Sequence, residues 1–372
     1  MIDIGRILKR SWQILWDYKV LWIFGFLLAI TTGGGGSGGG GGNSSSRYRF
    51  DQPNGRSDFD FGRGGPVMES LGRWFEQNVL PLLTHPEQHI STFVWLGILF
   101  FLLIVAVSVI AALIRYPSEV SVIRMVDEYE QTGAKVNFRA GWRLGWSRRA
   151  FRLWLTDLIL SLPVILLVFI MFGVGLLFFV TASADLDSSL AVLGTSLICA
   201  IPFALILIGV VLFLGLLRHL FARIIALDNL GIGDTFRHGW TLFKQNWKSV
   251  GLIWLIMIGI GILYGLASIV AFFILIPVYI ILAIPAALVA AIPGLLVFAI
   301  ASLFTAPPLT WIIAGLLALP FFFMVAFAPL VFLQGWYLLY ESNVWTLTYR
   351  ELTLSKATQT PVAEIDIPPV GK

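Results

Sequence analysis

The feature that most constrains this chain is a long stretch without ionisable side chains. From Ser249 to Tyr340 the sequence contains no Asp, Glu, Lys, Arg or His. A helix that crosses a bilayer needs about 20 consecutive apolar residues, so this stretch is long enough for more than one crossing. The whole chain is 58% hydrophobic and 12% charged, whereas about a quarter of the residues of a soluble domain are charged. The sequence therefore predicts an all-α fold, a polytopic transmembrane helix bundle.

Further apolar runs bring the predicted number of spans to six or seven. The first is short, since Val20 to Ile30 would rise about 16 Å as a helix, and a cleaved signal peptide is the alternative interpretation. Three prolines, Pro277, Pro285 and Pro293, punctuate another run. A broken re-entrant hairpin there would leave six crossings and a cytoplasmic C-terminus. The predicted spans are 12–32, 92–114, 153–180, 189–217, 249–275, 278–303 and 311–340.

Composition divides the chain into four parts. Residues 1–32 are predicted to form an amphipathic helix and the first span, and residues 33–91 an outward Gly-rich flexible loop with an interfacial helix. Residues 92–340 form the main transmembrane helical domain, and residues 341–372 a C-terminal tail that is partly disordered.

The distribution of lysine and arginine predicts the orientation of the chain. These residues are concentrated in segments 1–19, 115–152 and 217–248, whereas the loop 181–188 carries two aspartates and no basic residue. Alternating crossings place the three basic segments on one side of the membrane. The positive-inside rule makes that side cytoplasmic, and the N-terminus with it.

Each basic segment contains the same short pattern: a basic residue, any residue, a small residue and a tryptophan. The copies are 9–12, 139–142 and 237–240, and each leads into an apolar run. Apolar residues around each tryptophan recur with helical period, which predicts three interfacial amphipathic helices. These helices either anchor the spans or recognise lipid headgroups specifically. The residues predicted to meet headgroups are Lys9, Arg10, Trp12, Arg139, Trp142, Arg143, Arg148, Arg149, Arg237, Trp240, Lys244 and Lys248.

The net charge of +4 does not predict nucleic-acid binding. The basic residues lie between apolar runs and no recognised nucleic-acid motif accompanies them, so membrane lipids, above all anionic ones, are the predicted partners. Gly261 and Gly265 form a G-x-x-x-G pair, which predicts a close helix–helix contact within the chain or in a dimer.

Two strings of residues resemble a known family. One runs from Leu227-Asp228-Asn229 through Gly239-Trp240 to Asn246-Trp247, and the other from Ser342 to Leu352. They resemble poorly characterised prokaryotic polytopic proteins related to the membrane domain found beside glycerophosphodiester phosphodiesterases. The resemblance implies a multi-pass domain of a prokaryotic plasma membrane and no activity, because the linked enzyme's His-Arg pair has no counterpart among the four histidines.

No catalytic, cofactor or metal site is predicted. His85 and His89 have helical spacing, but Pro86 stands where a metalloprotease helix needs glutamate. Asp157 is the one acidic residue inside a predicted span, and either structural pairing or a proton or cation site explains it.

The leading hypothesis is therefore a non-enzymatic integral membrane protein concerned with bilayer organisation or lipid handling. The alternative is a transporter or flippase of a hydrophobic or lipidic substrate, because interrupted helices such as the proline-rich stretch 276–303 often line transport sites.

Overall fold

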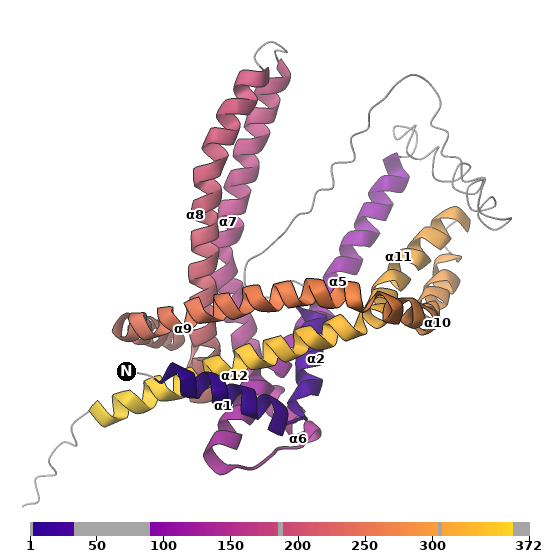
Figure 1. Cartoon of the computed structure of the whole chain (residues 1–372). Helices are drawn as coiled ribbons and strands as arrows, with labels where there is room; N and C mark the ends of the chain where they lie inside the picture. Colours follow the sequence, from indigo (N-terminus) through magenta and orange to yellow (C-terminus); the bar gives the residue numbers. More distant parts are fainter. Residues whose placement is uncertain (1–2, 33–89, 185–188, 304–306, 360–372) are drawn as a thin grey trace, which may run out of the picture. The chain divides into compact units, whose positions relative to one another are not determined.

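The computed structural model describes residues 3–32, 90–184, 189–303 and 307–359, which are helical almost throughout (Figure 1). No strand occurs in these ranges, which confirms the predicted all-α class. The α-helices are α1 (Ile4–Asp17), α2 (Leu21–Thr31), α5 (Ile90–Thr132), α6 (Phe138–Gly145), α7 (Arg148–Ala184), α8 (Ser189–Arg223), α9 (Ile232–Ile274), α10 (Ile276–Ala301), α11 (Pro307–Ala326) and α12 (Ala328–Gln359), and η2 (Ile224–Asp228) is a π-helix.

The chain forms two compact units. The first comprises α1, α2, the part of α5 from Ala111 onward, α6 to α9, and α12 from Pro329 onward. The second comprises the part of α5 up to Ile110 together with α10 and α11.

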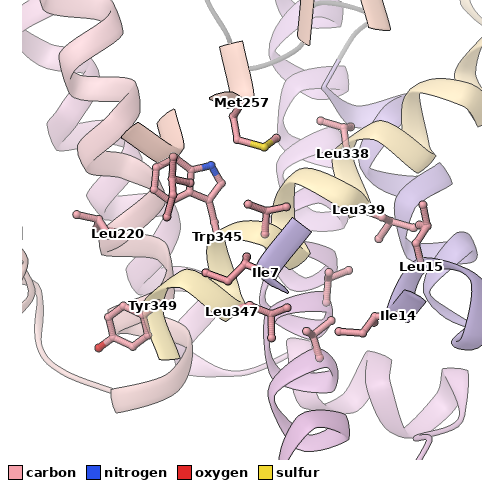
Figure 2. Packing of buried hydrophobic residues seen from close by; sticks show 14 of the residues in the cluster. Ile7, Ile14, Leu15, Leu220, Met257, Leu338, Leu339, Trp345, Leu347 and Tyr349 are labelled. Atoms are coloured by element: carbon pink, nitrogen blue, oxygen red, sulfur yellow. The ribbon is translucent and has the colours of Figure 1, made fainter. Parts of the chain in front are cut away.

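The first unit is centred on the C-terminal parts of three long helices. These parts are residues 118–126 of α5, 216–226 of α8 and η2, and 338–352 of α12, and we call them the three-helix core. Most of their side chains are buried, and every residue from Ser342 to Tyr349 is buried. Figure 2 shows Trp345 of α12 in this cluster, among side chains from α1, α8, α9 and α12.

Three amphipathic segments pack on the three-helix core: α1, α6 and the first part of α9. Each contacts it through the small residue of its repeat. Ser11 of α1 is fully buried and its carbonyl accepts a hydrogen bond from α12. A Cβ added to Gly141 would lie 2.4 Å from Met125 Sδ, and one added to Gly239 would lie 2.4 Å from Phe221 Cε1. Close packing therefore requires the small residue.

Two of the three amphipathic segments pack on the long helix that precedes them in the chain. α6 comes directly after α5 and folds back on it, and the first part of α9 comes directly after η2 and folds back on α8. α1 has no preceding helix and packs on the last one, α12. In α9 the amphipathic part ends at a kink, where Asn246 leaves the helical conformation (φ −123°).

α7 and α8 lie side by side as a long pair (Figure 1). Away from the three-helix core their apolar side chains are exposed, among them Leu166 (62%), Phe169 (68%) and Leu205 (64%). Surfaces of this kind are stable where lipid chains cover them.

The second unit contains a pair of apolar helices. The buried residues of α10 are Ala286, Ala290 and Gly294, which are spaced four apart and form one stripe. A Cβ at Gly294 would lie 3.2 Å from the Cβ of Ala318 on α11. Small residues thus let the two backbones approach closely, as is usual between membrane helices.

Five helices are long and apolar enough to cross a membrane, or up to seven if each of two bent pairs counts as one span. The predicted first span, 12–32, is not one helix. α1 ends at Asp17, α2 begins at Leu21, and their axes are bent by 101°. The side chain of Trp22 fixes this corner, because its Nε1 donates to the carbonyl of Leu15 at 2.8 Å.

The other interruption does not fall at the prolines singled out from the sequence. α10 is continuous through Pro285 and Pro293, so the re-entrant hairpin is not formed. Instead the interruption lies at Phe327, between the end of α11 at Ala326 and the start of α12 at Ala328, inside the predicted span 311–340. Pro329 explains this break, because a proline has no N–H and is tolerated in the first turn of a new helix.

Most of the predicted Gly-rich segment 33–91, with His85 and His89, lies outside the described residues, as does the tail beyond Gln359.

Candidate functional site

Charged side chains are enclosed beside the three-helix core, where α5, α7 and α8 meet. Arg218 of α8 joins the other two helices. Its Nε donates to Asp157 Oδ1 at 2.8 Å and Oδ2 at 3.0 Å, and its Nη2 donates to Glu119 Oε2 at 2.8 Å. None of the three side chains is more than 16% exposed. A single arginine therefore ties α5 and α7 to α8.

A second group of polar side chains, from α8 and α12, continues this cluster. The ring of His219 stacks on Trp345 with centroids 4.8 Å apart, and His219 Nε2 lies 3.4 Å from Glu341 Oε1. Arg223 is 2% exposed and donates to the carbonyl of His219 at 3.0 Å and to Ser342 at 3.4 Å. We call the two groups together the charge cluster.

The sequence placed most of these residues outside the spans. Glu119 and Arg218 fall in the basic segments 115–152 and 217–248, which were predicted to lie on the cytoplasmic side of the membrane. In the structure α5 continues to Thr132 and α8 to Arg223, so both residues lie inside long helices. Pro117, two residues before Glu119, does not interrupt α5. The pairing of Arg218 with Glu119 and Asp157 also joins positions far apart in the chain.

Two cavities adjoin the charge cluster. The larger has a volume of about 370 Å³ and lies among α5, α7 and α8; its polar lining residues are Arg115, Tyr116, Asp157, Ser161 and Arg218. The smaller, of about 50 Å³, is lined by Arg115, Glu119, Arg218, His219, Arg223 and Glu341, with Ser342 and three further residues. Only the larger falls in the size range of small-molecule sites, roughly 300–1,000 Å³.

Most residues predicted to meet lipid headgroups are exposed. Two lysines of α9 lie over tryptophan rings, with Lys244 Nζ 5.5 Å from the centroid of Trp240 and Lys248 Nζ 5.9 Å from that of Trp247. Such contacts leave the charge accessible while burying the lysine stem. The exposed members are Lys9, Trp12, Arg139, Arg143, Arg148, Arg237, Trp240, Lys244 and Lys248.

Three members of that set have protein partners instead. Arg10 pairs with Glu130 at 2.8 Å. Trp142 is half-buried, with its ring 6.4 Å from that of Phe24. Arg149 Nη1 donates to the carbonyl of Ala226, at the end of η2, where carbonyls lack intrahelical partners.

The two strings that carry the family resemblance contact one another. Tyr349, from the C-terminal string, donates to Asp228 Oδ2, and Asn229 adopts the left-handed conformation (φ 55°) that ends η2. Asn343 Nδ2 donates to the carbonyl of Ser11 at 3.4 Å. These residues hold the three-helix core together.

The two glycines of the G-x-x-x-G pair in α9 have different surroundings. A Cβ at Gly261 would lie 2.9 Å from Tyr337 Oη of α12, whereas one at Gly265 would meet nothing within 4 Å. Gly261 therefore makes a close contact within the first unit. Among the described residues, no group of three or more His, Cys, Asp and Glu side chains is placed to hold a metal ion.

These features define a polytopic, all-helical membrane protein with a charge cluster enclosed among its helices. The model of a family described as a family of unknown function (DUF7544) matches residues 8–344, so the chain belongs to this family. No curated protein and no solved structure matches it. The family match makes no connection with the membrane domain found beside glycerophosphodiester phosphodiesterases.

Proposed function

We propose that this protein interacts with anionic lipids of a prokaryotic plasma membrane through the exposed basic and aromatic residues of α1, α6 and the first part of α9. The supporting observation is that each repeat has one buried member and at least one exposed member. The small residue packs on the three-helix core, whereas the basic residue and, in α1 and α9, the tryptophan are exposed. All three segments share the buried small residue and the exposed basic residue, which supports contact of these cations with lipid headgroups.

The physical chemistry of that layer fits this arrangement. Indole rings are favoured at the membrane interface, and each Lys or Arg near an anionic surface contributes about 1 kcal/mol. In this proposal the three segments lie on the cytoplasmic side, together with the N-terminus. Bilayer organisation or lipid handling is the role that follows from it.

The experiment compares the lipids retained by the wild-type protein and by R143Q/R148Q. Both arginines are exposed and make no ion pair among the described residues. Each protein is reconstituted in nanodiscs of graded phosphatidylglycerol content, and the retained lipids are quantified by native mass spectrometry. We expect the variant to retain less phosphatidylglycerol, and the charge-preserving control R143K/R148K to match the wild type. Equal enrichment in R143Q/R148Q would overturn the proposal.

A second candidate function, movement of a hydrophobic or lipidic substrate across the bilayer, is favoured by the charge cluster. Enclosed ionisable residues in membrane helices commonly mark substrate or proton pathways. The continuity of α10 removes the interruption at 276–303 that first motivated this function. Vesicles containing the protein and a fluorescent lipid, treated with dithionite, test it: transport predicts quenching beyond the outer-leaflet signal.

We also propose that the family is related to the membrane domain found beside glycerophosphodiester phosphodiesterases. The support is the pair of strings that meet at Tyr349 and Asp228. A structure of that membrane domain without a matching three-helix core would contradict the relationship.

A further inference from the structure

The larger cavity of the first unit is a concave site, whereas the basic residues of the amphipathic segments are exposed side chains. It is an open pocket lined by α5, α7 and α8, has a volume of about 370 Å³, and combines polar with apolar lining residues. The question is which of its polar groups are free to bind a ligand, because a group already paired within the protein contributes little.

Two charged groups of the polar wall, Arg218 and Asp157, are already paired. Arg218 donates to Asp157 and to Glu119, and both oxygens of Asp157 are within 3.0 Å of Arg218 Nε. Asp157 therefore presents a carboxylate whose charge is compensated. It neither repels an anion strongly nor attracts a free cation.

Two groups of the polar wall remain open. Arg115 is half-buried and makes no hydrogen bond or ion pair among the described residues; its guanidinium carbon lies 5.6 Å from the ring centroid of Tyr116. The hydroxyl of Tyr116 makes no hydrogen bond within the same residues. A guanidinium is a donor only, and a phenol donates readily to an oxyanion. The open groups therefore select an acceptor with negative charge.

The overall charge around the cavity limits the ligand further. Arg115 and Arg218 are balanced by Glu119 and Asp157, so the surroundings are neutral as a whole. A neutral cavity with one open guanidinium fits a singly charged headgroup better than a polyanion.

The apolar lining of the cavity on α7 continues beyond it. Trp154 and Leu158 line it and are 37% and 43% exposed. Leu162 (56%) and Leu166 (62%) follow at intervals of four residues, and therefore lie on the same face of α7. This row offers an acyl chain a surface that starts at the cavity.

We infer that the cavity among α5, α7 and α8 binds one anionic amphiphile, whose headgroup meets Arg115 and Tyr116 and whose chain follows the apolar face of α7. The site is separate from the exposed residues of the proposed function. The relevant chemistry is an oxyanion headgroup, which a membrane lipid or a soluble phosphate ester carries equally, and the experiment distinguishes these two sources.

Glycine substitutions on α8 provide a test that leaves every charge in place. Gly215 lines the cavity, and a Cβ added there would meet nothing within 4 Å. Gly215→Leu therefore adds a bulky side chain at the site, with free space around its Cβ. Gly209→Leu is the matched control, because it lies on the same helix, is equally open, and does not line the cavity.

Isothermal titration of the full chain in a neutral detergent, with dioctanoyl phosphatidylglycerol as the probe, measures binding. We expect one site in the wild type, loss of binding in Gly215→Leu, and wild-type binding in Gly209→Leu. In Arg115→Gln the affinity should fall about tenfold, because a charge-assisted hydrogen bond is lost. The affinity of Arg115→Lys should lie between those of the wild type and Arg115→Gln, because lysine keeps the positive charge but lacks the planar, bidentate hydrogen-bonding geometry of the guanidinium.

Three outcomes would overturn the inference: no binding to the wild type, unchanged binding in both Arg115→Gln and Gly215→Leu, or glycerol 3-phosphate binding as tightly as the lipid. R143Q/R148Q should bind the probe like the wild type, so a failure of the proposed function leaves this site intact and is seen separately. If Arg115→Gln does not fold, as judged by its melting temperature, the comparison of Gly215→Leu with Gly209→Leu decides the question.

Discussion

The segment 342–349 of α12 and the helix α10 are opposite in polarity and in burial. The first contains Ser, Asn and two Thr residues, yet every one of its side chains is buried. α10 is almost wholly apolar, yet Ile281, Ile284 and Ile292 are each at least 70% exposed. In a soluble protein the apolar helix would form the core. The difference shows that the bilayer takes the apolar surface here, while the protein interior is selected for packing and hydrogen bonding.

The two threonines of the buried segment are satisfied locally. Thr346 and Thr348 each donate to the carbonyl four residues earlier, at 2.7 Å. This removes the cost of an unpaired hydroxyl and leaves the methyl groups to pack. Three predictions test whether the buried and exposed regions differ energetically as their structures imply.

The largest effect is expected at the charge cluster. Arg218→Met would leave Glu119 and Asp157 enclosed without their partner, so the free energy of unfolding should fall by about 3–5 kcal/mol. Arg237→Gln, at an exposed position, should change it by less than about 0.5 kcal/mol. Thermal unfolding in one detergent, followed by circular dichroism, compares the two. A melting temperature of Arg218→Met equal to that of the wild type would show that the cluster does not hold these helices together.

The same substitution at a buried leucine of α8 and at an exposed leucine of α7 compares the protein interior with the lipid-facing surface directly. Leu220 is 1% exposed and Leu166 is 62% exposed. Leu220→Ala creates a cavity in the three-helix core and should cost about 2–5 kcal/mol.

Leu166→Ala should be nearly neutral, within about 0.5 kcal/mol, because detergent or lipid fills the space. Equal losses in the two variants, measured by the same unfolding experiment, would mean that the outer part of α7 is covered by protein.

A smaller effect is expected where the repeats contact the three-helix core. Gly239→Leu would place a Cβ 2.4 Å from Phe221 Cε1, and overpacking of this kind should cost about 1–3 kcal/mol. Gly251 lies on the same helix with nothing within 4 Å of an added Cβ, so Gly251→Leu should leave stability unchanged or raise it by up to about 1 kcal/mol. The order of the two melting temperatures is the measurement, and the reverse order would contradict the assigned packing.

Much of the fold follows from the sequence because hydropathy reports directly on lipid exposure. The uncharged stretch from Ser249 onward predicted the membrane class, and the threefold pattern around Trp12, Trp142 and Trp240 located the amphipathic segments. The function of the small residue in that pattern was not predicted. A glycine such as Gly141 indicates close packing against a neighbouring element, but the sequence does not identify which helix that neighbour is.

Of the candidate site, the sequence analysis singled out Asp157, which pairs with Arg218, and the rest was missed for a related reason. Glu119, Arg218 and Glu341 stand at the ends of apolar runs, where charges ordinarily face water or headgroups. Their enclosure depends on three helices continuing without a break and meeting at one level, and no local pattern encodes this. The interruption at Phe327 was missed as well, because three prolines elsewhere gave a stronger local signal than Pro329.

The central claim is that the three-helix core is packed by protein while the apolar faces of α7 and α10 are covered by lipid. Photo-crosslinking of the wild-type protein in vesicles, with a phospholipid carrying a diazirine in its acyl chain, tests this without any substitution. Mass spectrometry of the peptides should find adducts in 158–176 of α7 and 276–301 of α10, and none in 342–349 of α12 or 219–226 of α8 and η2. Adducts in those two core segments, or their absence from α7 and α10, would contradict the account.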